Sequence, residues 1–285
     1  MVVTFPTSLV LLIFMVSCSV NIFMADSEPV CQPAYPAHAI AVDEGDVAPQ
    51  LVMGGPPPIG AKKAKLDNLT LNIITEFAYE EDPQKNCRWV PKALMDLSAG
   101  NFAKLIDSAF GYALVPPFDP YHDSLSYMIS CYVLPYMGLV AYAGTHHSLA
   151  LLIRFCILAQ LLAGLLGVES GQDAVIRTYL YERAKEQVHP YKHTVAEFTA
   201  RISELRNRLG KCGIKDEGII VPKELGAENR TTTNVLSSDA DSISYMRTPA
   251  EELRIVYSTG DEHIPGGFYP KGGNGKIARG FLKKP

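Results

Sequence analysis

The residues best suited to chemistry lie in the run LLAGLLGVESGQDAVIRTYLYERAKE, residues 161–186. Its apolar positions recur every three or four residues, which predicts one long helix whose apolar stripe also carries Glu169, Gln172 and Asp173. A carboxylate on that stripe points into a helix-packed core, where it is costly unless it is paired, hydrogen-bonded, protonated or bound to a metal. Helix bundles build carboxylate metal sites from a Glu followed three residues later by a second ligand. Glu169 therefore predicts either a metal ligand or a buried carboxylate satisfied by Arg177, a tyrosine hydroxyl or backbone donors.

Other groups that could bind a metal are less convincing. Asp261, Glu262 and His263 gather three potential ligands, but adjacent loop residues rarely converge on one ion, so they predict a surface turn. Of the six cysteines, Cys18 lies near the N-terminus, and the remaining five form no CxxC or Cys/His spacing. The sequence also lacks a GxSxG motif, a phosphate loop and a glycine-rich dinucleotide turn.

Amino-acid composition and charge indicate which classes of binding partner to expect. With 285 residues and 47% apolar side chains the chain can bury a substantial core. The net charge is −4 and the pI is near 6.0, and Lys and Arg are scattered rather than clustered. We therefore expect no nucleic-acid surface.

The N-terminus indicates export. Residues 1–25 carry no charged side chain, and an apolar stretch is followed there by small residues, which is typical of a secretory signal peptide. A single-pass anchor is the alternative, but the continuous apolar part is short for a bilayer span. Two glycosylation sequons, at Asn68 and Asn229, agree with secretion.

Prolines, glycines and helix-capping residues mark the predicted boundaries of segments and helices in the rest of the chain. Residues 26–61 are Pro- and Gly-rich and predict an irregular segment, whereas 62–210 predict a helical bundle and 211–285 a C-terminal extension with one short helix. The expected helices cover residues 66–81, 98–110, 124–143 with a kink at Pro135, 161–186 and 194–210, and a short one follows the N-cap Thr248. Gly210 stands where a helix C-cap belongs. The predicted core residues are Phe77, Leu105, Leu139, Leu165, Leu166, Ile176 and Leu205.

The apolar region from Tyr127 to Val168 raises the question of a membrane hairpin. Prolines, glycines, two histidines and Arg154 interrupt every clean span of 18 residues. The pattern therefore predicts buried bundle helices and no stable membrane insertion.

Several segments carry a family resemblance. LLAGLLGVESGQDAVIRTYLYERA, LMDLSAGNFAKLID, HTVAEFTARISELRNRLG and RIVYSTGDEHIPGGFYPKG are similar to plant desiccation-related proteins with a ferritin-like domain, and the likeness covers most of residues 47–282. The resemblance implies a four-helix ferritin-like core, export to the apoplast or cell wall, and accumulation in drying tissue. No biochemical activity is securely implied.

The departures from this family concern the metal ligands. A first core helix with a Glu is expected before Val47, where this chain has the Pro-rich run PVCQPAYPAHAIAVDEGD. In the second helix Glu81 matches, but Gln84 stands at the His position behind Pro83. Residues 145–160 also differ from the expected polar loop. Such local replacements between well-matched blocks are typical of misjoined exons or a retained intron, at residues 25–50, 82–92 and 145–160.

A two-metal site needs a Glu on each of two helices and a Glu-x-x-His on each of two others. This chain offers Glu81 on one helix and Glu169 with Gln172 on another, and Gln is a weak substitute for imidazole toward iron or manganese. We therefore interpret these three residues as vestigial ligands and expect no bound cofactor, with iron or manganese as the alternative.

The sequence thus predicts an all-α, ferritin-like helical bundle, incomplete at its N-terminus, with an irregular C-terminal extension. The expected function is that of a secreted, non-enzymatic, desiccation-related protein with a structural or protective role under water deficit. A di-iron or di-manganese bundle with oxidase-like or metal-storage activity is the alternative. Cell-wall components or a second copy of the chain are the expected partners.

Overall fold

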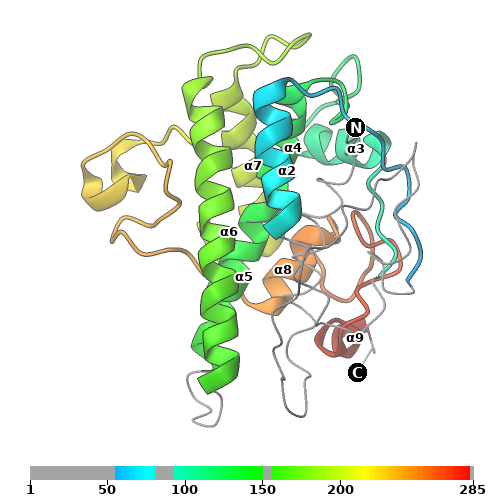
Figure 1. The fold of residues 1–285 in the computed structure, drawn as a ribbon, viewed down its shortest axis with the longest axis vertical. Coiled ribbons are helices and arrows are strands. Elements are labelled where there is room, and N and C mark those ends of the chain that lie inside the picture. Colours follow the sequence, from blue (N-terminus) through cyan, green and yellow to red (C-terminus); the bar gives the residue numbers. More distant parts are fainter. Residues whose placement is uncertain (1–54, 81–92, 150–155, 283–285) are drawn as a thin grey trace.

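The computed structural model describes residues 55–80, 93–149 and 156–282, and Figure 1 shows them as an assembly of helices. The predicted signal peptide, most of the segment 26–61, Glu81 and Gln84 lie outside the described residues.

The longest helix of the described part is α6 (Cys156–Glu182). Helix α5 (Pro135–Leu149) packs along it, and α4 (Ser124–Val133) and α7 (Val195–Gly210) also contact it. Helix α2 (Asn68–Glu80) lies beside α6 in Figure 1, where the Thr70 hydroxyl donates a hydrogen bond to the Tyr179 hydroxyl at 3.2 Å. The described residues contain isolated bridges but no sheet, which confirms the all-α bundle.

The C-terminal extension is more helical than predicted. Besides the expected α8 (Pro249–Val256) it contains α9 (Lys276–Leu282) and two 3-10 turns, η3 (Lys223–Leu225) and η4 (Ala227–Asn229). A Gly-rich aromatic strip packs on the bundle, because Phe268 is buried with its ring 5.2 Å from that of Phe102 in α3 (Ala99–Phe110). The extension is therefore a packed part of the protein.

Helix ends follow local capping chemistry. Ser98, Thr194 and Thr248 each accept a hydrogen bond from a backbone N–H in the first turn of α3, α7 and α8, and Thr248 completes a capping box with Glu251. The prediction for Gly210 was wrong, because Gly210 is the last helical residue and Lys211 takes the left-handed conformation with φ 70°. A Cβ at Gly210 would lie 2.5 Å from Nη1 of Arg247, so glycine there lets this buried guanidinium pack closely against the end of α7.

Pro135 separates α4 from α5, as the sequence predicted. By length and composition Ser124–Gly144 could cross a membrane, the only such stretch among the described residues. Most of its side chains are buried inside the protein, as in the core helix of a soluble fold.

Five predicted core residues are buried, namely Phe77, Leu105, Leu139, Ile176 and Leu205. Leu165 and Leu166 are only partly buried, which corrects their assignment to the core. They lie in the N-terminal half of α6, which projects past α2 and α7 in Figure 1 and runs beside α5. Leu166 packs there against a small separate cluster of Tyr136, Leu139 and Val140.

Candidate functional site

Glu169 and Gln172 lie on the buried face of α6, with 1% and 2% of their surfaces exposed. Opposite Glu169 stands Gly138 of α5, where a Cβ would lie 2.6 Å from Cδ and 2.7 Å from Oε2 of the carboxylate. A larger residue at 138 would therefore occupy the space that the carboxylate needs. The two helices thus hold the Glu169 carboxylate between them, in the place that the sequence predicted for a core carboxylate.

The donor set around Glu169 does not fit a two-metal carboxylate centre within the described residues. Helix α5 contains no Asp or Glu, and Glu76 of α2 is exposed. Glu169 and Gln172 thus supply one carboxylate and one amide on the buried face of α6, where such a centre needs four Glu and two His. Glu81, the third predicted ligand, lies outside the described residues.

One turn beyond Glu169, a buried network of charges crosses the bundle. Arg177 of α6 pairs with Asp173, Nε to Oδ2 at 3.1 Å, and with Asp216 of the extension at 3.8 Å. Arg206 of α7 donates to Asp216 as well, from Nη2 to Oδ1 at 3.1 Å. The sequence offered Arg177, a tyrosine hydroxyl or backbone donors as partners of Glu169, and the ion pairs of the Arg177 guanidinium are with two aspartates.

Aromatic rings cover the same network. The guanidinium of Arg177 lies 5.1 Å from the Tyr132 ring centroid and 5.2 Å from that of Tyr136, and Arg206 lies 4.7 and 4.8 Å from the same rings. Burial raises the pKa of Asp173, although Arg177 acts to lower it. The four-residue spacing of Asp173 and Arg177 was the sequence signal for this network, whereas nothing local pointed to Asp216.

Glu217 connects the network to the loop that follows it. Its Oε2 accepts a hydrogen bond from Nδ2 of Asn234 at 2.5 Å, and its Oε1 accepts one from the Tyr245 hydroxyl. Burial raises the pKa of Glu217 to about 7, against the lowering effect of these two donors. This carboxyl group therefore titrates near neutral pH, which the sequence gave no reason to expect.

The cluster Asp261, Glu262 and His263 is closer together than the sequence predicted, with possible ligand atoms within 4.8 Å of one another. Arg254 occupies both oxygens of Glu262, at 2.6 and 2.8 Å, and lowers the pKa of Glu262 to about 2. Nδ1 of His263 lies 2.6 Å from the Phe281 carbonyl. These contacts explain the cluster as an anchored surface turn.

Both predicted glycosylation sites are at the surface. Asn68 is the first residue of α2, Asn229 is the last residue of η4, and both side chains are exposed. Attachment of a glycan stays a prediction.

Comparisons with known proteins identify relatives of the chain. The ferritin-like domain family matches residues 33–182. The chain is 66% identical over 241 residues to the ferritin-like catalase Nec2 of Nesocodon mauritianus, covering 83% of this chain and 76% of that protein. It is 46% identical over 248 residues to the desiccation-related protein PCC13-62 of Craterostigma plantagineum, covering 85% of this chain and 77% of the relative. No solved structure matches.

These relatives confirm the resemblance to desiccation-related, ferritin-like proteins and correct one expectation. The sequence was interpreted as that of a protein without enzymatic activity, and the likeness to a catalase contradicts this. The expectation depended on counting metal ligands in the sequence, and this count did not predict whether the chain is an enzyme.

Proposed function

Because the chain belongs to the ferritin-like domain family, we propose that it is an enzyme that decomposes hydrogen peroxide, as a catalase does. The observation that carries this proposal is the 66% identity to a ferritin-like catalase over 83% of the chain. The 46% identity to a desiccation-related protein supports a role in tissue that loses water.

Glu169 is the residue around which we place the reaction. In peroxide disproportionation one molecule gives up two protons and two electrons, and a second molecule takes them up. A buried carboxylate, such as that of Glu169 packed against Gly138, is suited to hold and move those protons. Electron transfer needs a redox partner that Glu169 cannot supply, and the described donors alone do not form a metal pair.

Oxygen evolution from hydrogen peroxide by the purified full chain tests the proposal. Glu169→Gln keeps the shape of the side chain and removes the proton-accepting group, so we expect activity to fall about 10²–10⁴-fold. Ser170→Ala, an exposed neighbour on α6, is the matched control and should leave activity unchanged.

Metal analysis of the same preparations measures iron and manganese per chain. An active wild-type enzyme whose Glu169→Gln variant evolves oxygen at the same rate would remove Glu169 from the reaction. Absence of oxygen evolution before and after incubation with iron or manganese salts would refute the peroxide proposal itself.

We further propose that the protein is secreted to the apoplast or cell wall. The charge-free residues 1–25 and the exposed sequons at Asn68 and Asn229 support export. A reporter fusion that is cleaved, glycosylated and recovered outside the cell is the expected result. A full-length, unglycosylated fusion in the cytosol would contradict it. Binding to cell-wall components and self-association stay predictions.

A further inference from the structure

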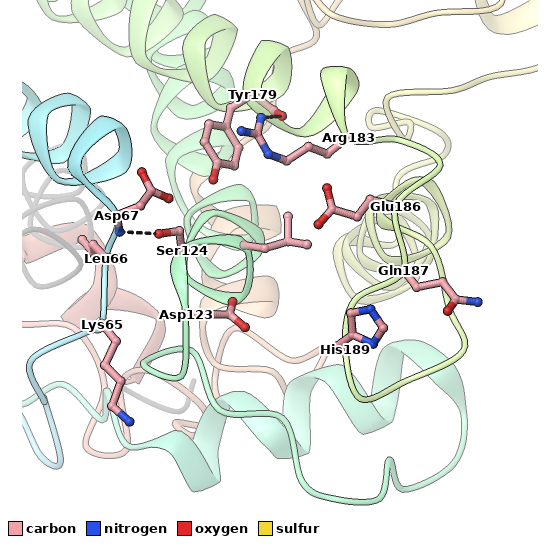
Figure 2. Close-up of a pocket in the computed structure, with 11 residues that line it drawn as sticks. Lys65, Leu66, Asp67, Asp123, Ser124, Tyr179, Arg183, Glu186, Gln187 and His189 are labelled. Carbon is pink, nitrogen blue, oxygen red and sulfur yellow. Dashed lines mark hydrogen bonds between the residues drawn. The ribbon is translucent and has the colours of Figure 1, made fainter.

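A cleft of about 540 Å³ lies at one end of the bundle, where the first residues of α2 and α4 meet the last turns of α6 (Figure 2). Tyr179, in its wall, stands ten residues after Glu169, which places the cleft roughly 15 Å away along the helix axis. The cleft is therefore separate from the Glu169 site. Its volume lies in the range of small-molecule sites.

Hydrogen bonds between elements give the cleft a defined shape. The Asp67 amide donates to Oγ of Ser124 at 2.8 Å, which joins the start of α2 to the start of α4. Tyr179 is buried, and its hydroxyl accepts a hydrogen bond from the Thr70 hydroxyl, which joins α2 to α6. Leu66 and Leu125 add apolar surface to the wall.

Two of the three carboxylates in the wall accept hydrogen bonds from the first turns of the helices that they cap. Asp67 accepts bonds from the amide and the hydroxyl of Thr70, at 2.8 and 3.0 Å. Asp123 accepts the Ser126 amide at 2.8 Å and lies 2.9 Å from the His122 ring. The positive ends of α2 and α4 offset these two negative charges.

The third carboxylate is available for a ligand. Glu186 is exposed, and its carboxylate forms no hydrogen bond or ion pair with the described part of the chain. Figure 2 shows Glu186 and Asp123 on opposite sides of the cleft with their carboxylates turned inward, while Gln187 points away. Arg183 lies over the Tyr179 ring, 3.8 Å from its centroid, and gives one hydrogen bond to the Tyr179 carbonyl, which leaves other N–H groups available.

The carboxylates of the cleft do not converge as the ligands of one metal ion would. Among the described residues, the group of three possible ligands that converge within 4.8 Å is Asp261, Glu262 and His263, and none of these lines the cleft. Lys65 also lines the cleft, but Figure 2 shows its ammonium group turned away from Glu186 and Asp123. With the capped aspartates compensated, the inward-facing charges are the Glu186 carboxylate and the Arg183 guanidinium, which are of opposite sign. A ligand there needs both hydrogen-bond donors and acceptors, spread over several ångströms, and no net charge.

We propose that this cleft binds a neutral polyhydroxylated ligand, a sugar or polyol. Glu186 accepts hydrogen bonds from ligand hydroxyls, and Arg183 donates to ligand oxygens. Leu66 and Leu125 contact the apolar C–H faces of the ligand. Such a ligand is found free in solution or as the end of a polysaccharide, and both sources share this chemistry.

Isothermal titration of the full chain with sucrose and with cellotetraose tests the proposal. We expect saturable binding of at least one of them, and Glu186→Ala should weaken it about tenfold or more, because it removes a charged hydrogen-bond acceptor. Glu182→Ala is the matched control, since Glu182, the last residue of α6, is exposed, stands four residues before Glu186 and lies outside the cleft. Preference for sucrose indicates a free sugar, and preference for cellotetraose indicates a chain end.

Three results would overturn the proposal. The first is no binding of either sugar up to about 10 mM. The second is equal affinity of the wild type and Glu186→Ala, with circular dichroism showing both folded. The third is tighter binding of spermidine than of either sugar, which would show that the cleft selects positive charge. Glu186→Gln keeps the side-chain size and gives the same comparison if Glu186→Ala does not fold.

Discussion

The contact between Gly138 and Glu169 makes a quantitative prediction about packing at the candidate site. Gly138→Ala adds a methyl group 2.6 Å from Cδ and 2.7 Å from Oε2 of Glu169, well inside the contact distance of about 3.5 Å for non-bonded heavy atoms. Since Glu169 is 1% exposed, the carboxylate cannot turn into solvent without moving α5 or α6. Gly171→Ala is the matched control, because Gly171 lies within α6 with no atom within 4 Å of a built Cβ.

The two variants share the gain in helix propensity and differ in packing. Replacing a helical glycine with alanine stabilises by about 0.5–1 kcal/mol. Overpacking a tight site costs about 1–3 kcal/mol. The unfolding free energy of Gly138→Ala should therefore fall below that of Gly171→Ala by about 1–3 kcal/mol. In a chain of this size each kcal/mol shifts the melting temperature by about 2–4 °C.

Urea and thermal unfolding of both variants measure this difference. A third and a fourth protein, Glu169→Ala with and without Gly138→Ala, complete a double-mutant cycle. Removing the carboxylate makes room for the methyl group, so Gly138→Ala should cost less in that background. If Gly138→Ala is as stable as Gly171→Ala, or costs the same without the Glu169 side chain, the packing described for this site is wrong.

Three further predictions concern the rest of the molecule. Arg177→Met leaves Asp173 and Asp216 without their shared partner and should cost about 3–5 kcal/mol in urea unfolding, and a cost below about 1 kcal/mol would contradict the network. The folded pKa of Glu217, about 7, lies above its ordinary value of 4.5, so its contribution to stability is full below about pH 4.5 and is lost as pH rises through 7. Glu217→Gln should flatten that part of the stability profile, and an unchanged slope would exclude this group as its source. Thr248→Ala removes a capping box and should lower the unfolding free energy by about 0.5–2 kcal/mol, as measured by thermal unfolding, whereas Ser242→Ala, at an exposed loop residue, should not.

The fold could be predicted where the signal was local in sequence. Ser98, Thr194 and Thr248 cap helices that begin at the next residue, because a cap and its first turn are sequence neighbours. Pro135 divides two helices for the same reason. The burial of Glu169 also followed from the stripe on its own helix.

What the sequence could not predict depends on contacts between distant segments. The glycine at position 138 makes room for a side chain that lies 31 residues later, and the one at position 210 makes room for Arg247. Leu165 and Leu166 share the periodicity of core residues, yet their half of α6 projects past other helices. The sequence of α6 alone does not predict where its neighbouring helices end. The pairing of Asp216 with two arginines likewise appears only when the extension folds onto the bundle.

That pairing has a consequence for how this protein changes during evolution. Asp216 belongs to the extension, while Arg177 and Arg206, with almost no exposed surface, belong to the bundle. A truncation or recombination point near residue 211 would leave Arg206 buried without its carboxylate partner and Arg177 with Asp173 alone, a change that costs several kcal/mol. We therefore expect selection to keep the two parts together in one chain. Fusing this bundle to a foreign C-terminal segment would require either replacing Arg206 or supplying a new carboxylate for it.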